Sequence, residues 1–188
     1  MTPSEDPLVW IDCEMTGLDP ETDTIMSIAC FITDYELNTI DEDGYEAVVH
    51  HPKDDLDRMG AWCRKHHGES GLTQACIDST TTADQAAEGL LTYIQKHVSK
   101  PRVALLAGNS VHADRSFLVK EPWNRVMEYL HYRILDVSTI KEAARRWSPV
   151  AVLKKVPKKK MLHEAREDIL ESIREARYYR EAIFQQKN

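Results

Sequence analysis

The chain has 188 residues, of which 42% are hydrophobic and 29% are charged. This size and composition predict one compact domain over residues 1–188 with a substantial hydrophobic core, and argue against two domains. The 24 basic and 31 acidic residues give a formal charge of −7, which argues against a broad phosphate-neutralising surface of the kind that binds long duplexes. A short nucleic-acid ligand, which needs only a few local cations, stays compatible with this charge.

Composition also bears on the compartment. No apolar run reaches the ~20 residues needed to span a bilayer, and residues 1–7 lack the basic start and apolar stretch of a secretory signal. The four cysteines are scattered along the chain, as is typical of free thiols in a reducing compartment. We therefore expect an intracellular protein with no membrane partner, cytoplasmic in the first place, with the mitochondrion and the nucleus as alternatives.

The first fifty residues predict three strands. An apolar run that starts at Leu8 predicts the first strand, which ends at a turn over residues 17–20. Residues 25–32 are apolar enough for a strand buried on both faces, and a third strand is expected over 45–50. Three strands with short links predict an antiparallel meander.

From residue 82 on, helical and strand patterns alternate. The predicted elements are a helix over 82–98, a strand over 102–107 that ends at Gly108, a helix from Ala113 interrupted by Pro122, a strand over 132–135, a helix over 136–147 and a last helix over 162–184 with an apolar stripe. This order predicts an α/β fold, in which an antiparallel meander is followed by parallel strands in one mixed sheet with helices packed on it.

The first strand carries two carboxylates, Asp12 and Glu14, set two residues apart. Alternate residues of a strand share a face, so the two side chains are expected to lie side by side. Like charges at that distance repel, and apolar neighbours remove hydration, so the pair is costly unless a cation lies between them. The segment is therefore a candidate site for a hard divalent cation.

Two further carboxylates are candidates for the same site. Asp114 follows the C-terminal end of a predicted strand, where open α/β sheets commonly bind ligands. Asp168 lies in the last predicted helix, with His163 five residues before it. At ~100° per residue, positions 163 and 168 point in different directions on a helix, so both reach one site only if His163 lies in the loop or first turn.

These residues resemble the motifs of the DEDDh 3′→5′ exonucleases, a family in the RNase H-like superfamily, and within it most closely the oligoribonucleases. The matching segments are residues 10–19 with Asp12-x-Glu14, Gly108-Asn109-Ser110 with Asp114, residues 131–139, and His163 followed by Asp168. The resemblance extends over about residues 8–184, so one exonuclease domain is expected. As an isolated pair, Asp12-x-Glu14 is more often a solvated strand edge; the complete set in order is specific.

The resemblance implies an RNase H-like fold, a homodimer, and removal of nucleoside 5′-monophosphates from the 3′ end of very short single-stranded RNA, with short DNA as a second possible substrate. It implies two Mg²⁺ or Mn²⁺ ions held by Asp12, Glu14, Asp114 and Asp168. His163, with an ordinary pKa near ~6.5, would act as general base.

The resemblance also assigns residues to substrate binding. Leu18 matches a wedge against the terminal bases, and Trp62 and His67 match aromatic positions that flank the substrate. Asn109 and Ser110 of the second motif are assigned to substrate binding. A cap on the substrate's 5′ phosphate is implied for Tyr132, Arg133, Ser138 and Thr139, partly from the second subunit. Such a closed site would measure substrate length and favour dinucleotides.

The sequence departs from the family at some positions, and some segments allow more than one interpretation. Ser27 stands where the family usually has an acidic residue, and Glu167 where an aspartate is common, while Glu164, Glu167 and Glu171 are expected to be exposed helix acids. Residues 148–161 match the family poorly, and the lysine run over 154–160 predicts a solvated loop, with a nuclear address or an RNA contact as the alternatives. A zinc site is the less favoured interpretation of Cys63, His66, His67 and Cys76.

Two other functions compete with an oligoribonuclease. One is an exonuclease that trims the 3′ ends of longer RNA or of DNA, which would be expected to have a more basic groove. The other is a catalytically silent RNase H-like module that binds nucleic acid or protein, which would be expected to lack at least one of the four carboxylates.

Overall fold

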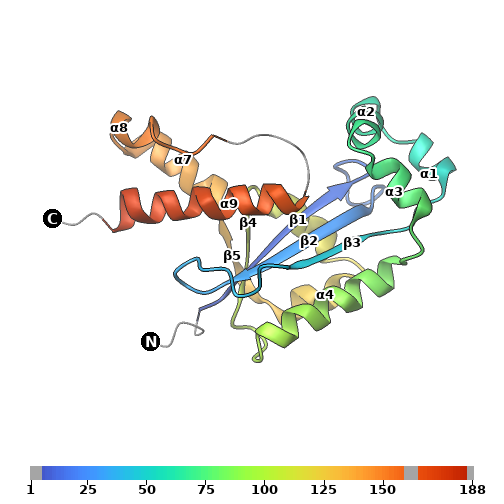
Figure 1. The fold of residues 1–188 in the computed structure, drawn as a ribbon, viewed down its shortest axis with the longest axis horizontal. Helices are drawn as coiled ribbons and strands as arrows, with labels where there is room; N and C mark the ends of the chain where they lie inside the picture. Colours follow the sequence, from blue (N-terminus) through green and yellow to red (C-terminus); the bar gives the residue numbers. More distant parts are fainter. Residues whose placement is uncertain (1–5, 159–164, 186–188) are drawn as a thin grey trace.

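A five-stranded mixed sheet runs through the centre of the protein in our computed structural model, which describes residues 6–158 and 165–185 (Figure 1). The strands are β1 (Leu8–Met15), β2 (Ile25–Thr33), β3 (Tyr45–Val48), β4 (Leu105–Gly108) and β5 (His131–Asp136), in the spatial order β3-β2-β1-β4-β5. β2 pairs antiparallel with β1 and β3, whereas β4 pairs parallel with β1 and β5. The predicted fold class, a meander followed by parallel strands, is confirmed.

Helices cover both faces of this sheet. They are α1 (Lys53–Asp57), α2 (Ala61–Glu69), α3 (Leu72–Asp78), α4 (Ala83–His97), α5 (His112–Leu118), α6 (Asn124–Tyr129), α7 (Val137–Trp147), α8 (Val150–Leu153) and α9 (Ala165–Tyr179), which continues into a π-helical turn, η1 (Arg180–Phe184). In Figure 1, α9 crosses one face of the sheet, α4 lies against the other, and α2 and α3 stand at the C-terminal end of β1. None of the helices in the described part of the chain is both long and apolar enough to cross a membrane.

The alternation of side chains along β1 decides which face carries the acidic pair. Val9, Ile11 and Cys13 pack into the core on the α4 side. Leu8 and Trp10 pack into the second core, with Ile169 and Ile173 of α9. Because alternate residues of a strand share a face, Asp12 and Glu14 lie on the α9 side of the sheet.

Several element boundaries differ from the prediction. β3 ends at Val48, because the backbone N–H of His50 turns away to Thr81. β4 begins only at Leu105, because Arg102 has a left-handed φ of 63° and its N–H donates to Tyr129. The short helices α1, α3 and α8 were not predicted, since one or two turns give too little periodicity to recognise. The predicted start of the last helix at 162 lies outside the described residues.

Candidate active site

Three carboxylates meet where β1 passes the first turn of α9. Asp12, Glu14 and Asp168 each offer an oxygen, and these oxygens lie within 4.8 Å of one another. β1 places the first two on one face, and the packing of α9 on that face brings the third. In residues 6–158 and 165–185 this is the only group of three or more acidic, histidine or cysteine side chains arranged to hold a metal ion.

The electrostatics of this group favour a bound cation. Burial, followed by the negative charges of Asp168 and Asp114, raises the pKa of Glu14 from its ordinary value of 4.5 to about 7. A carboxylate in that state takes up a proton unless another positive charge replaces it. An all-oxygen donor set suits Mg²⁺, Mn²⁺ or Ca²⁺. The residues present therefore fit a hard divalent cation.

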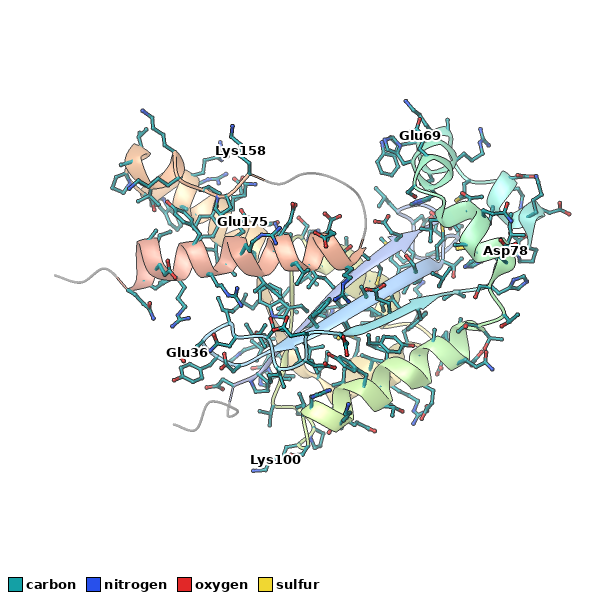
Figure 2. All side chains as sticks on the ribbon, viewed as in Figure 1. Glu36, Glu69, Asp78, Lys100, Lys158 and Glu175 are labelled. Atoms are coloured by element: carbon teal, nitrogen blue, oxygen red, sulfur yellow. The ribbon has the colours of Figure 1, made fainter. Side chains whose placement is uncertain are left out.

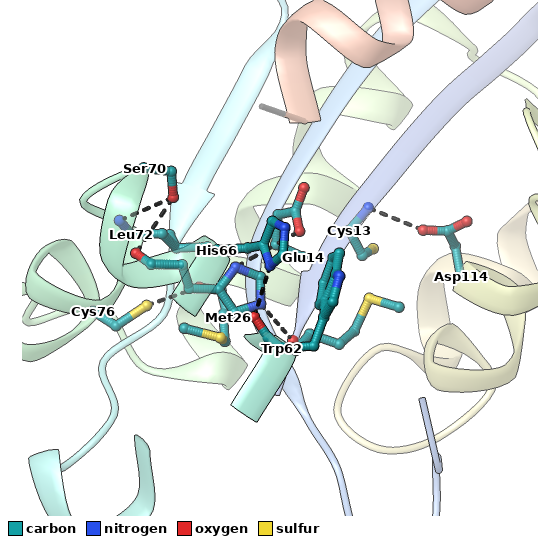
Figure 3. A network of polar contacts seen from close by, with 11 residues as sticks. Cys13, Glu14, Met26, Trp62, His66, Ser70, Leu72, Cys76 and Asp114 are labelled. Carbon is teal, nitrogen blue, oxygen red and sulfur yellow. Dashed lines mark hydrogen bonds and ion pairs between the residues drawn. The ribbon is translucent and has the colours of Figure 1, made fainter. Parts of the chain in front are cut away.

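Asp114 lies beside β1, in the first turn of α5, and is buried. Its Oδ1 accepts a hydrogen bond of 3.0 Å from the backbone N–H of Cys13, the residue between Asp12 and Glu14 (Figure 3). Burial raises the pKa of Asp114 to about 7, although the Cys13 hydrogen bond opposes the rise. Asp114 is thus adjacent to the group of three without belonging to it, and its role as a metal ligand stays a prediction. His163 lies outside the described residues.

Arg166, which the sequence analysis did not single out, ties the first turn of α9 to the β2–β3 connection. Its guanidinium donates to the carbonyl oxygens of Glu42 and Asp43 and, at 3.0 Å, to Oε1 of Glu46. It also lies 4.7 Å from the ring centroid of Phe31. The helix dipole disfavours a cation in the first turn of a helix, so the position of Arg166 could have indicated from the sequence that its side chain has a specific partner. Because Asp168 is two residues away, Arg166 fixes the part of α9 that carries it.

The loop after β1 presents Leu18 to solvent. The side chain of Leu18 is 83% exposed. Asp23 closes the loop, because its carboxylate accepts from the Thr16 hydroxyl at 2.9 Å and from the Asp19 N–H at 3.0 Å. A Cβ at Gly17 would meet that carboxylate at 2.3 Å, so any other residue there would displace Asp23. The predicted wedge is an exposed apolar side chain on the hydrogen-bonded loop that follows β1, the strand that carries Asp12 and Glu14.

Helix α2 holds the two predicted aromatic positions in different environments. Trp62 is 56% exposed and stacks on His66 with ring centroids 4.0 Å apart (Figure 3). His67 is buried; its Nε2 lies 2.9 Å from the carbonyl oxygen of Met15, and its Nδ1 lies 3.9 Å from Oε2 of Glu14. Trp62 is therefore available to a ligand, whereas His67 joins α2 to the end of β1 beside Glu14.

A second loop, between β4 and α5, meets the start of α7. The N–H groups of Ser110 and Ser138 both donate to Oδ1 of Asp136, at 2.9 and 2.8 Å. The two serine hydroxyls are 3.1 Å apart. Asn109 donates from Nδ2 to Oε2 of Glu175 at 3.1 Å. Ser110, a predicted substrate-binding residue, thus lies beside the predicted cap residue Ser138 at the N-terminus of a helix.

The remaining predicted cap residues lie on the outer strand of the sheet and the next helix. Tyr132 of β5 is 73% exposed, and the guanidinium of Arg133 lies 5.3 Å from the centroid of its ring. Arg133 and Thr139 are exposed as well. Nothing within the described part of the chain covers this surface, which leaves it accessible to a substrate or to another subunit.

One prediction was wrong, and one alternative finds no support. Glu171 is buried, not exposed, because it lies where α9 packs against its neighbours, with Arg174 at 3.6 Å. Glu167 is half-buried, and Glu164 lies outside the described residues. Cys63, His66, His67 and Cys76 form no common cluster in the described residues, and Cys76 instead donates to the carbonyl of Met26.

Ser27 pairs with Glu14 across β1 and β2, so this departure from the family lies beside the carboxylates. The lysines of residues 154–158 are exposed, as predicted.

Comparison with known proteins gives consistent results at the level of sequence. The model of an exonuclease family, RNase_T, matches residues 9–176. The mitochondrial oligoribonuclease of Mus musculus is 48% identical over 180 residues, which cover 96% of this chain and 74% of that protein. The oligoribonuclease of Streptomyces avermitilis is 47% identical over 179 residues, which cover 95% and 88%.

Solved structures agree on the fold. Pop2p of S. pombe, in a form with bound Mg²⁺ and Mn²⁺, aligns with a TM-score of 0.72 and 14% identity, covering 95% of this chain and 84% of that one. E. coli exonuclease I in complex with a dT13 oligonucleotide aligns with a TM-score of 0.71 and 14% identity; the chain spans 43% of that protein. At such identities the likeness shows a shared fold and no more.

Proposed function

The chain belongs to the RNase_T exonuclease family and, within it, to the oligoribonucleases, and we propose that this 3′→5′ exoribonuclease hydrolyses very short RNAs, dinucleotides above all, to nucleoside 5′-monophosphates. That reaction is the last step of RNA decay. The observation that carries the proposal is the meeting of Asp12, Glu14 and Asp168 next to the exposed Leu18 loop. The catalytically silent alternative is not supported.

We propose that two divalent cations, Mg²⁺ or Mn²⁺, are held by Asp12, Glu14, Asp168 and Asp114. Support comes from the oxygen-only donor set and from the raised pKa of Glu14, which marks a site that lacks positive charge. When bound, divalent cations supply charge that stabilises the developing negative charge on the scissile phosphate. Asp114 would contribute from its position against the Cys13 amide.

The protein's own groups then divide the remaining tasks. His163 would accept the proton of the attacking water, for which an ordinary histidine pKa near ~6.5 is well suited. Leu18 and Trp62 would contact the terminal bases, since both present apolar surface to solvent. His67 would act from beside Glu14 rather than as an open stacking surface.

The preference for short substrates would come from a phosphate cap, by which we mean Ser110, Ser138, Arg133, Thr139 and Tyr132. Two adjacent hydroxyls, a guanidinium and a helix N-terminus form an anion site of the kind that suits a terminal phosphate. Tyr132, on the outer strand β5, would reach the site of a second copy in a homodimer. Residues 8–184 would act as one domain, in the cytoplasm or, like the relatives named mitochondrial, in that organelle.

The test is a length series. We would incubate the protein with 5′-labelled RNAs of two to twenty nucleotides and with the matching DNA dinucleotide, with and without EDTA, beside Asp12→Ala. The proposal expects rapid, EDTA-sensitive cleavage of the RNA dinucleotide, slower cleavage of longer RNAs, and no cleavage by Asp12→Ala. Equal rates on the dinucleotide and a long RNA would instead favour the 3′-trimming alternative. Sedimentation velocity tests the dimer, which a purely monomeric active form would contradict.

A further inference from the structure

A buried carboxylate outside the group of three lies in the middle of α9. Glu175, labelled in Figure 2, has a side chain that is only 2% exposed. Its Oε2 accepts from Asn109 Nδ2 at 3.1 Å, and its Oε1 accepts from the Tyr179 hydroxyl at 3.2 Å. The ammonium of Lys141, on α7, lies 3.8 Å from Oε1. A buried charge is costly unless such donors surround it, so this glutamate joins three elements through specific contacts.

The contact with Asn109 leads directly to the phosphate cap. Asn109 precedes Ser110, whose left-handed φ of 52° is unusual for a residue other than glycine. The backbone N–H of Ser110 donates to Asp136, and the Ser110 hydroxyl lies beside that of Ser138. Ser110, the strained residue that carries a cap hydroxyl, is therefore held by Asp136 directly and by Glu175 through its neighbour Asn109.

The amide of Asn109 depends on Glu175 for its orientation. Its Oδ1 is buried and accepts no hydrogen bond from the described residues, whereas its Nδ2 donates to Glu175. Without that bond, no described hydrogen bond would hold the amide in this direction.

We propose that Glu175 is a positioning residue for the 5′ end of the substrate. By holding Asn109, it keeps the Ser110 hydroxyl next to Ser138, and so sets the preference for a dinucleotide that carries a 5′ phosphate over one that ends in a 5′ hydroxyl. This inference rests on the proposed phosphate cap. It adds a residue that touches no substrate.

A neutral isostere is the sharpest perturbation. Both oxygens of Glu175 accept from donors. Glu175→Gln leaves Asn109 facing either an amide N–H₂ or an uncharged carbonyl oxygen, because the Tyr179 hydroxyl can accept as well as donate, and in both cases Asn109 loses its hydrogen bond to a charged group. Loss of one hydrogen bond to a charged group corresponds to about a tenfold change in affinity. Tyr179→Phe is the matched control, because it removes a donor to the same carboxylate and leaves Asn109 in place.

The experiment measures kcat and KM for one dinucleotide with and without its 5′ phosphate, in the parent, Glu175→Gln, Asn109→Ala, the double variant and Tyr179→Phe. Glu175→Gln should lower the ratio of kcat/KM between the two substrates by about tenfold, through a higher KM for the phosphorylated one. The double variant should match Asn109→Ala alone, since the two residues act in series. Circular dichroism checks folding, and Glu175→Asp, which withdraws the carboxylate by one methylene, replaces any Glu175→Gln protein that does not fold.

The outcomes separate the two proposals. A parent that does not distinguish the two substrates overturns the phosphate cap and this inference with it. A parent that prefers the 5′ phosphate, together with an unchanged ratio in the Glu175 variant, overturns this inference alone. Additive losses in the double variant also overturn it, because Glu175 would then act independently of Asn109.

Discussion

Replacing Glu14 with glutamine should stabilise the metal-free protein while destroying its activity. The side chain of Glu14 is 16% exposed, and burial together with Asp168 and Asp114 raises its pKa from 4.5 to about 7. Since the folded protein holds this proton more tightly than the unfolded chain does, the stabilisation it gives is complete below pH 4.5 and is lost as the pH rises through 7. Above pH 7, ionising Glu14 costs the folded state about 3 kcal/mol.

A free-energy difference of this size is large enough to measure by unfolding experiments. At pH 8 with EDTA, the free energy of unfolding of Glu14→Gln should exceed that of the parent by about 2–3 kcal/mol. For a chain of this size, this difference raises Tm by roughly 5–10 °C. At pH 5 the parent's Glu14 is protonated, so the difference should fall below about 1 kcal/mol. Saturating Mn²⁺ should stabilise the parent much more than the variant, because ligand that binds only the folded state adds to its stability. Thermal and urea unfolding followed by circular dichroism measure all three effects.

The control is Glu167→Gln, the same chemical change one residue from Asp168 but outside the group of three. Its effect should stay within about 0.5 kcal/mol at both pH values, as for an ordinary surface substitution. A Glu14→Gln protein that melts at or below the parent temperature at pH 8 in EDTA would refute the reasoning. So would a stability difference that does not change between pH 5 and pH 8.

Four further variants test the site. Asp12→Asn should weaken Mn²⁺ binding by at least about a hundredfold, measured by calorimetry, since even residues that only support metal ligands contribute up to that much. His163→Ala should lower kcat by about 10²–10⁴-fold and keep Mn²⁺ affinity; a parent-like kcat would disprove its role as base. Arg166→Ala should weaken Mn²⁺ binding roughly tenfold because the first turn of α9 loses its attachment, whereas Arg145→Ala, on the exposed face of α7, should not. Trp62→Ala should raise KM for a dinucleotide by about 5–30-fold, the equivalent of one base stack, and an unchanged KM would remove Trp62 from the substrate site.

Local pattern was enough to find the elements that build the sheet and its main helices. β1 and β2 are apolar runs bounded by turns, and α4 shows helical periodicity. Thr82 and Gln85 explain where α4 begins, since the side chain of each accepts a hydrogen bond from the backbone N–H of the other. The Asp12 and Glu14 pair was predictable because strand alternation alone puts both on one face.

Contacts between residues far apart in the sequence could not be predicted from local patterns. The hydrogen bond from Cys13 to Asp114 joins residues 101 positions apart, and nothing local to either residue indicates it. Glu171 and Glu175 look like solvent-facing helix acids, and only the packing around α9 buries them. The anchoring of Arg166 on Glu42 and Asp43 likewise depends on where the β2–β3 connection lies in space.

The order in which the carboxylates occur along the chain has a consequence during protein synthesis. Asp12 and Glu14 leave the ribosome early and pair with β2 close by in sequence, whereas Asp168 is carried by α9, the last long helix. N-terminal segments generally fold first, and distant contacts form later. A nascent chain whose α9 is still in the exit tunnel thus lacks Asp168 and has an incomplete set of carboxylates. Such a chain is expected to bind no catalytic cation until α9 has emerged and packed on the sheet.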